Sequence, residues 1–411
     1  MKKNVVILST MYYPDMGAPS ACIDKYVQAL KTKYNFYIIT KTYKMSDEFI
    51  HKDNVTYISC LRHKLILRCK HNINSGNHII LSRLLFKLID AYKLIATQFC
   101  NPTANSWENR AYYKELKKLS KINKIDTVIS VSNTAFCQFA ARKFKKANED
   151  VKWITFILDP FAENYIYYRY KILKKYWKHK NLKNEEDFFR SSDYTLLSED
   201  MYRFAMGNFN MNPSTTYCIR FTLNNLRTCF PKTIDSVDRY KLIYAGALYQ
   251  KIRNPEFMLS VIAQVPNSYL DLFVDSGECD GIIENYVSDY ITRQAFAPKD
   301  RYNEMICDEY DFLVNIGNIS QLQSPSKMLD LLSTGRPIIN FYFVKDSQYE
   351  MIEKYPLGIN VGFQEEGAVE KVSAFCSEMK GKVLSFSEVS GLFPENDQSK
   401  QVLLLDSLIM S

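Results

Sequence analysis

Short apolar runs alternate along the chain with longer stretches of helical periodicity, which is the pattern of a parallel α/β fold. Residues 5–9 (VVILS) predict a strand, residues 20–31 a helix and residues 36–40 (FYIIT) a second strand. This order of elements builds a parallel sheet with right-handed crossovers. The first half of the chain continues with predicted strands at residues 55–58, 127–130, 153–157 and 193–197 and a predicted helix at residues 184–190.

A second series of strands and helices follows a break in this pattern. After Thr222 the chain is rich in Asn, Pro and Asp, as in an inter-domain linker. The later predicted strands are residues 240–245, 269–274, 311–316 and 338–341, and the helices between them are residues 255–264 and 302–308. We therefore expect an α/β fold with two doubly wound Rossmann-like domains, residues 1–222 and 239–395, that face a cleft. A terminal helix within residues 396–411 is expected to pack back across the domains.

One segment fits two different places in such a fold. Residues 79–96 are apolar at most helical positions, but they also contain Arg83, Lys87 and Lys93. A helix of this composition belongs either to a protein core or to a surface in which it is embedded. The sequence leaves both interpretations open.

The net charge of +8 is divided unevenly along the chain. Residues 1–220 hold 36 Lys and Arg against 19 Asp and Glu, whereas residues 221–411 hold 17 against 26. The basic half favours an anionic partner, and residues 165–183 place Tyr and Trp beside Lys and Arg, which suits a lipid headgroup surface. A solvated helix of a lysine-rich protein is the alternative. Because no RNA- or DNA-binding module accompanies the charge, we expect an anionic membrane rather than nucleic acid as the partner.

Composition also bounds the location and the chemistry. The chain has no uncharged apolar run of about 18 residues, and its N-terminal apolar run is short, so neither a membrane span nor a signal peptide is predicted. We expect a cytoplasmic protein at the inner face of the plasma membrane. The ten cysteines are scattered without zinc-site spacing, which predicts buried free thiols and no metal. The five histidines fall in no motif.

Residues 324–337 (SPSKMLDLLSTGRP) form the most informative motif. A helix is expected to begin near Ser326, with its positive dipole end directed at whatever lies in front. Lys327 and Asp330 share one helix face and could offer a cation to phosphate and a carboxylate to ribose hydroxyls. Gly335, with Pro337 two residues later, should end the helix. The alternative is an ordinary amphipathic helix with a Lys–Asp pair on its surface.

The order of motifs over nearly the whole chain resembles bacterial GT-B glycosyltransferases of family four, which assemble capsules, exopolysaccharides or O-antigens. The matching segments are ILSTMYYPDMGAPS, ITFILDPF, YAGALYQKIRNPEFML and SPSKMLDLLSTGRP. The resemblance implies that Gly17 lets the backbone approach a substrate. It also implies that Gly246 forms a turn and that a following cation, Lys251 or Arg253, holds the donor diphosphate. Ser326, Lys327 and Asp330 would complete the donor site.

The chain departs from the family pattern at three positions. Leu322 stands where many members have Glu, eight residues before Asp330. Asp330 itself replaces the commoner Glu, and Ala247 stands where Arg is frequent, which leaves Lys251 or Arg253 to supply the cation. The first departure bears on how the sugar is held.

The resemblance implies transfer of a sugar from a nucleotide diphosphate-sugar, with a UDP-sugar favoured, to a hydroxyl of a lipid-linked glycan. It further implies a metal-independent reaction without a cofactor, with retention of the anomeric configuration. Asp159 ends a predicted strand at the cleft and is the candidate to orient or deprotonate the acceptor hydroxyl. A turn-forming Asp-Pro is an equal alternative for this residue, and Glu163 is a weaker candidate for the catalytic role.

Two other functions remain open. Some GT-B chains are noncatalytic partner subunits of an active glycosyltransferase, and this chain could be one of them. A nonhydrolysing sugar-nucleotide epimerase shares the fold, but the catalytic acids and histidines of this chain match it poorly. The sequence does not identify the sugar, the base, the acceptor or the linkage.

Overall fold

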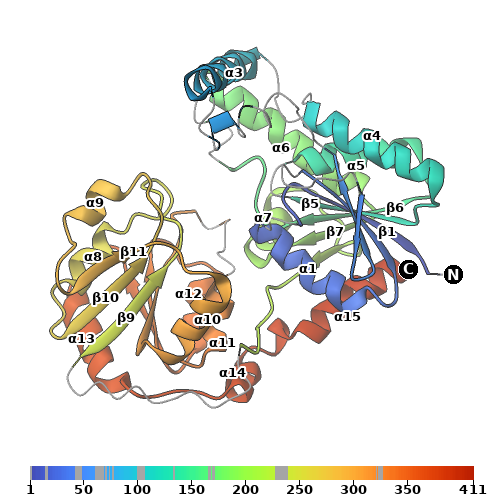
Figure 1. Cartoon of the computed structure of the whole chain (residues 1–411). Coiled ribbons are helices and arrows are strands. Elements are labelled where there is room, and N and C mark those ends of the chain that lie inside the picture. Colours follow the sequence, from blue (N-terminus) through green and yellow to red (C-terminus); the bar gives the residue numbers. More distant parts are fainter. Residues whose placement is uncertain are drawn as a thin grey trace. The chain divides into compact units, whose positions relative to one another are not determined.

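The computed structural model describes residues 2–13, 17–41, 49–60, 69, 72–73, 75, 78–99, 107–132, 135–164, 168, 172–226, 239–320, 322 and 327–411. The chain divides into two compact units (Figure 1). Unit 1 comprises Met1–Ile219 and Val402–Ser411, and unit 2 comprises Arg220–Gln401. Within the described residues, no helix is long and apolar enough to cross a membrane.

Unit 1 is built on a sheet whose described strands follow the order β3-β4-β2-β1-β5-β6-β7-β8. All neighbouring strands are parallel except the pair β3 and β4. The strands are β1 (Asn4–Ser9), β2 (Asn35–Thr40), β3 (Phe49–Lys52), β4 (Val55–Ser59), β5 (Thr127–Ser132), β6 (Lys152–Ile157), β7 (Tyr194–Leu197) and β8 (Thr216–Cys218). The helices are α1 (Ala18–Leu30), α3 (Ile79–Phe99), α4 (Trp107–Ile122), α5 (Phe136–Ala147), α6 (Lys174–Ser191), α7 (Glu199–Asn208) and α15 (Gln398–Met410).

Unit 2 has a sheet in which every described pair of strands is parallel, in the order β11-β10-β9-β12-β13-β14. The strands are β9 (Tyr240–Ala245), β10 (Ser268–Phe273), β11 (Ile291–Gln294), β12 (Phe312–Ile316), β13 (Ile338–Tyr342) and β14 (Gly358–Gly362). The helices are α8 (Glu256–Ile262), α9 (Asp280–Glu284), α10 (Lys299–Asp308), α11 (Lys327–Ser333), α12 (Ser347–Lys354), α13 (Ala368–Met379) and α14 (Phe386–Leu392), followed by the 3-10 helix η2 (Pro394–Asn396).

Both sheets are doubly wound, as the sequence predicted. In β9, Leu242 belongs to a core cluster that includes α8 and α13, while the adjacent Ile243 belongs to a second cluster that includes α10 and α11. Successive strand residues point to opposite faces, so each face of the sheet carries its own apolar core. The strand order reverses between β1 and β5 in unit 1 and between β9 and β12 in unit 2. In such sheets the reversal point is where ligands bind.

Most predicted elements are observed within a few residues of their expected bounds. The helix expected at residues 184–190 is the last part of the longer α6, and the segment expected at residues 79–96 is α3. The residues just after Thr222, expected as a linker, belong to unit 2, and residues 227–238 lie outside the described residues. Among the described cysteines, five are buried and three half-buried, and none of them forms a disulfide.

A ladder of buried amides crosses the sheet of unit 2. Asn315, Asn340 and Asn360 lie at matching register positions on β12, β13 and β14. The Nδ2 of Asn315 donates to Oδ1 of Asn340 at 2.8 Å, and the Nδ2 of Asn340 donates to Oδ1 of Asn360 at 2.7 Å. Asn315 also donates to Gln348 of α12 at 3.2 Å. Because buried amides must be paired, the ladder penalises any other register of these strands.

The end of α11 depends on Gly335. This residue has φ +72°, and a Cβ built on it would lie 1.9 Å from the carbonyl oxygen of Leu384. The Leu384 amide donates to the Gly335 carbonyl at 2.9 Å, so the two backbones are in direct contact. Glycine is therefore required both by the left-handed conformation and by the close approach.

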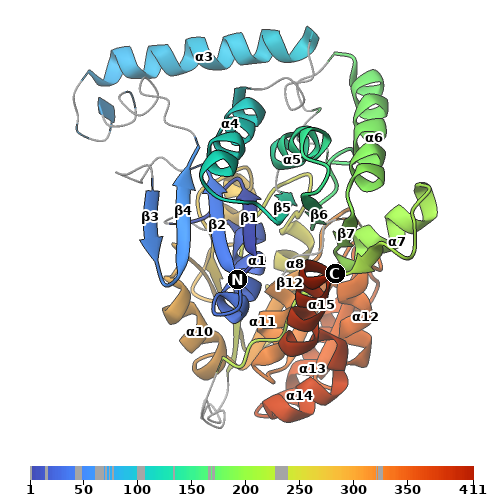
Figure 2. The ribbon, with the colours of Figure 1, turned by 90° about the vertical axis from the view of Figure 1, so that its right-hand side faces the viewer.

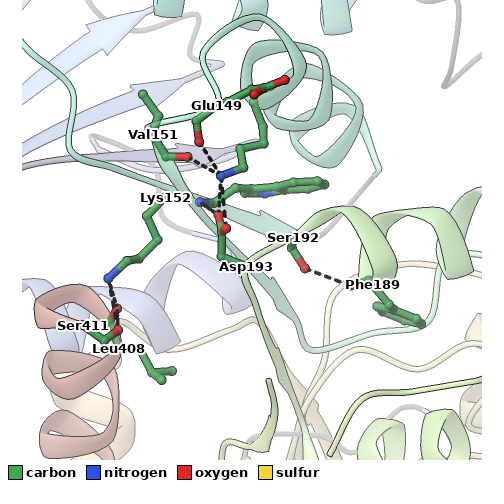
Figure 3. Close-up of polar contacts among 10 residues, drawn as sticks. Glu149, Val151, Lys152, Phe189, Ser192, Asp193, Leu408 and Ser411 are labelled. Carbon is green, nitrogen blue, oxygen red and sulfur yellow. Dashed lines mark hydrogen bonds and ion pairs between the residues drawn. The ribbon is translucent and has the colours of Figure 1, made fainter. Parts of the chain in front are cut away.

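The terminal helix α15 is bound to unit 1 through its last carbonyl groups (Figure 3). The ammonium of Lys3 donates to the carbonyls of Ile409 and Met410, each at 2.9 Å. The ammonium of Lys152, at the start of β6, donates to the Leu408 carbonyl at 2.8 Å and to Oγ of Ser411 at 3.1 Å. Two lysines thus satisfy carbonyls that have no partner within the helix and complement its negative dipole end.

We predict that Asn340→Ala lowers the free energy of unfolding by about 2–4 kcal/mol, because it leaves a buried donor on Asn315 and a buried acceptor on Asn360 without partners. Urea unfolding followed by circular dichroism measures the change. Asn285→Ala, at an exposed position of unit 2, is the control and should change stability little. Equal small effects of the two variants would contradict a structural role for the ladder.

Candidate functional site

A small pocket lies at the reversal point of unit 2, beside the carboxyl ends of β9 and β12. The strands deliver backbone groups and side chains to this edge, while α10 and α11 supply side chains from one face of the sheet. The polar lining residues are Tyr244, Arg253, Tyr302, Asn315 and Lys327, and the remainder are Ile243, Ala245, Ile306, Val314 and Leu331. All of these lining residues belong to unit 2.

Lys327 places its ammonium in this pocket. Its Nζ donates to the Ala245 carbonyl, the last of β9, at 3.0 Å and lies 5.8 Å from the ring centroids of Phe296 and Tyr302. Burial lowers the pKa of Lys327, and the nearby Arg253 guanidinium lowers it further, while Asp330 opposes the change. An ammonium has three donors and the Ala245 carbonyl accepts only one, so this partly desolvated cation is equipped to bind an anion.

Arg253 is the second cation of the pocket. Its Nε and Nη2 donate to Oδ1 of Asn318 at 3.1 and 2.9 Å, which fixes the plane of the guanidinium. The sequence left the choice between Lys251 and Arg253 open. In the structure Arg253 lines the pocket, whereas Lys251 is exposed and does not. Arg253 and Lys327 together give one small pocket two positive charges, which favours a polyanion such as a diphosphate.

Gly246 follows β9 directly and keeps this space open. A Cβ at this position would lie 3.1 Å from the Tyr244 hydroxyl and 3.5 Å from Nζ of Lys327. A Cβ here would therefore crowd the Tyr244 hydroxyl, whereas its contact with the Lys327 ammonium would be an ordinary one. The sequence prediction of a glycine turn beside the cations agrees with this placement.

Tyr244 is a site residue that the sequence did not single out. Its side chain is 2% exposed, and within the described residues its hydroxyl makes no hydrogen bond of regular geometry, although the Arg253 guanidinium lies close to it. Burial raises the pKa of the phenol, and the Arg253 guanidinium opposes the rise. A buried hydroxyl without a partner is unfavourable in the ligand-free protein, so such groups call for a functional explanation. The signal in the sequence was a polar aromatic residue two positions before Gly246.

Asp330 is held by a residue expected in the linker. Its Oδ1 accepts a hydrogen bond from Nδ2 of Asn224, and the backbone N–H of Asn224 donates to Oγ of Ser333 at 3.0 Å. The expected helix α11 is present, but Lys327 turns toward Ala245 rather than forming a surface pair with Asp330. Ser326 lies outside the described residues.

Two predicted residues belong to unit 1. Gly17 precedes α1 with φ −84°, and a Cβ there would lie 3.3 Å from Cβ of Met11 in its own loop. Asp159 follows β6 and is half-buried, and burial raises its pKa to about 6. The structure therefore groups Gly246, Arg253, Lys327 and Asp330 in unit 2, with Gly17 and Asp159 in the other unit.

A buried acid that the sequence did not single out holds the loop after Asp159. Glu185 of α6 is fully buried and accepts hydrogen bonds from the amides of Phe161 and Ala162 at 2.8 and 3.2 Å. Burial raises its pKa to about 7, although the two amides oppose the rise. Glu185 thus fixes the backbone two residues beyond Asp159. The described residues contain no group of three or more His, Cys, Asp or Glu side chains that could hold a metal ion.

No protein-family model and no curated protein matches the chain, but its fold has been solved before. Sucrose-phosphate synthase from Thermosynechococcus elongatus is similar over 99% of this chain and 98% of its own, with TM-score 0.68 and 11% identity. Anabaena HepE in complex with UDP and glucose is similar over 99% of both chains, with TM-score 0.63 and 10% identity. WaaG, a glycosyltransferase involved in lipopolysaccharide biosynthesis, covers 97% of this chain and 95% of its own, with TM-score 0.58 and 11% identity. The chain has the GT-B fold, as the sequence predicted.

We predict that Tyr244→Phe raises the free energy of unfolding of the ligand-free protein by about 1 kcal/mol, because it removes a buried hydroxyl that lacks a partner. Tyr310→Phe is the matched comparison, since the Tyr310 hydroxyl donates to Asp271 at 2.7 Å. That variant should lose stability instead. Chemical denaturation of both variants measures the two signs, and a loss in Tyr244→Phe would show that its hydroxyl is already satisfied.

Proposed function

We propose that the protein is a glycosyltransferase that moves a sugar from a nucleotide diphosphate-sugar to a hydroxyl of a lipid-linked glycan during synthesis of a cell-surface polysaccharide. The observation that carries the proposal is the pair of cations, Lys327 and Arg253, at the strand reversal of unit 2. A UDP-sugar is the favoured donor, because HepE, which has the same fold, was solved with UDP-glucose. On the resemblance of its motifs we assign the chain to the capsule, exopolysaccharide or O-antigen type of glycosyltransferase family four.

The two cations would stabilise the leaving group. When the bond between the sugar and the diphosphate breaks, negative charge accumulates on the leaving oxygen. The ammonium of Lys327 and the guanidinium of Arg253 are already held in a partly dehydrated pocket, where they would stabilise such charge without having to reorganise. This arrangement could perform the task that a metal ion performs elsewhere, which supports a metal-independent reaction with no cofactor. On the resemblance of its motifs to the family, we also propose retention of configuration.

Two further side chains would hold the donor. The Tyr244 hydroxyl, which lacks a partner, would donate to a phosphate oxygen, and the Asp330 carboxylate would accept from ribose hydroxyls. Gly17 in unit 1 would let the backbone approach a substrate. Ser326, which precedes Lys327 in the sequence, is a further proposed donor-site residue.

Asp159 is the proposed acceptor-side residue. A pKa raised to about 6 leaves the carboxylate ionised at neutral pH and makes it a better base than an exposed aspartate. It would orient or deprotonate the acceptor hydroxyl, and Glu185 would hold the adjoining loop. Because the acceptor is lipid-linked, we place the protein in the cytoplasm, at the inner face of the plasma membrane, with the basic N-terminal part of the chain on anionic lipid.

One observation favours a second candidate function. Leu322 is a half-buried apolar residue at the position where the family often has a glutamate. A chain without that carboxylate could act as a noncatalytic GT-B partner subunit of another glycosyltransferase.

Donor binding separates the two candidates. Calorimetry with UDP-, GDP- and dTDP-sugars should show saturable binding of one donor, weakened about tenfold or more in Lys327→Met because a charge-assisted contact is lost. Asp330→Asn should also weaken it. Lys251→Met is the control, since that lysine is exposed on the loop that carries Arg253, and this variant should bind the donor almost normally. If the folded protein binds none of the donors, the partner-subunit function is favoured.

The pH dependence tests Asp159. The carboxylate must be ionised to act as a base, so its raised pKa predicts that kcat/KM falls as the pH drops through about 6. Asp159→Asn should reduce the rate by roughly 100-fold or more and abolish this acid limb. An unchanged acid limb in the variant would assign the ionisation to another group.

A further inference from the structure

Helix α3 exposes a continuous apolar stripe. Its exposed large apolar side chains are Ile80 (86% exposed), Leu81 (58%), Leu84 (54%), Leu88 (59%) and Ile95 (64%). At 3.6 residues per turn these positions lie along one side of the helix. Figure 2 shows α3 lying across one end of unit 1. The large aliphatic side chains of a helix in a soluble protein are normally turned inward, so this stripe marks an interaction surface.

The residues on the face of α3 opposite the stripe are less exposed than those of the stripe. Ser82 is buried, and Ile79, Leu85, Phe86 and Ile89 are half-buried. These residues occupy the side away from the stripe, so the helix packs with one apolar face and presents a second one. This decides the question that the sequence left open, because α3 is a surface helix and not a core helix.

Cations border the stripe. Arg83 and Lys87 are exposed next to Leu84 and Leu88, and the sequence of α3 contains a single acidic residue, Asp90. An apolar stripe with adjacent cations is the composition of helices that lie in a membrane interface.

The beginning of α6 repeats this chemistry. The residues immediately before and within its first turn are exposed and are of apolar and cationic types, namely Ile172 (83% exposed), Leu173 (59%), Lys174, Lys175 and Tyr176 (55%). Figures 1 and 2 both place the start of α6 at the same end of unit 1 as α3. One end of unit 1 therefore carries two segments with exposed apolar and cationic side chains.

We propose that α3 is the membrane-binding element of the protein and lies in the plane of an anionic bilayer, with its apolar stripe among the lipid chains and its cations on lipid phosphates. The proposal deepens the membrane location given under the proposed function. A second copy of the chain fits this surface less well, because a symmetric contact through the stripes would bring Arg83 and Lys87 of one copy close to those of the other. Anionic lipid neutralises these charges, whereas a second copy adds to them.

Vesicle flotation of the full-length protein tests the proposal. Phosphatidylcholine vesicles with and without phosphatidylglycerol are the probes, and binding to the anionic vesicles should exceed binding to the neutral ones by about tenfold or more. Leu84→Ser with Leu88→Ser removes part of the stripe, and Arg83→Gln with Lys87→Gln removes the bordering cations. Each pair should weaken anionic-vesicle binding by about tenfold. Ile122→Ser on α4, a 75% exposed isoleucine, is the matched control and should bind normally.

Two outcomes would overturn the assignment. Vesicle binding unchanged in both double variants would remove α3 from the membrane contact. A dimer in light scattering that the Leu84→Ser, Leu88→Ser variant converts to a monomer, with no loss of vesicle binding, would assign the stripe to a second copy. Donor binding, measured on the same preparations, reports on the pocket of unit 2 and confirms folding. Failure of the donor assay with intact vesicle binding would reject the proposed catalysis and leave the role of α3 standing.

Discussion

The candidate site depends on one constraint, which is that the partly buried ammonium of Lys327 must be hydrogen-bonded. The carbonyl at the end of β9 meets that need, and Gly246, the next residue, leaves room beside the Tyr244 hydroxyl. The carboxyl end of β9 lies at this edge of the sheet. β9 is a central strand, next to the point where the strand order reverses. The sheet topology, the glycine and the charge are therefore parts of one arrangement, in which the described residues occupy one of the three ammonium donors.

Around this cation, most buried polar groups are paired, but the Tyr244 hydroxyl is not. The amide ladder and the contact at Gly335 hold the strands and α11 rigidly, so the cations can be positioned without help from a ligand. The Tyr244 hydroxyl, by contrast, has no partner among the described residues. A rigid frame around an unsatisfied donor is expected of a site that gains interactions only when its ligand binds.

The sequence predicted what local spacing determines. Lys327, Asp330 and Gly335 were found because helix periodicity and glycine chemistry are local. The hydrogen bond from Asn224 to Asp330 was missed because it joins residues far apart in the chain, and Tyr244 was missed because a strand tyrosine counts as apolar in a periodicity pattern. Periodicity likewise shows that α3 has apolar faces but not whether each face is covered. Strand β3 was not predicted, although the turn between β3 and β4 has a signal in the sequence. This signal is the adjacent pair Asp53 and Asn54, which both adopt positive φ.

The attachment of α15 has a consequence for the order in which the molecule can be made. Val402–Ser411 belong to unit 1, and Lys3 and Lys152 donate hydrogen bonds to carbonyls of this segment. On a ribosome those residues appear only after all of unit 2 has been synthesised. Unit 1 is therefore the first unit to be synthesised, but its packing cannot be completed until residues 402–411 have been made. A chain stalled before residue 402 would lack the segment that Lys3 and Lys152 bind, so its N-terminal unit would be unfinished.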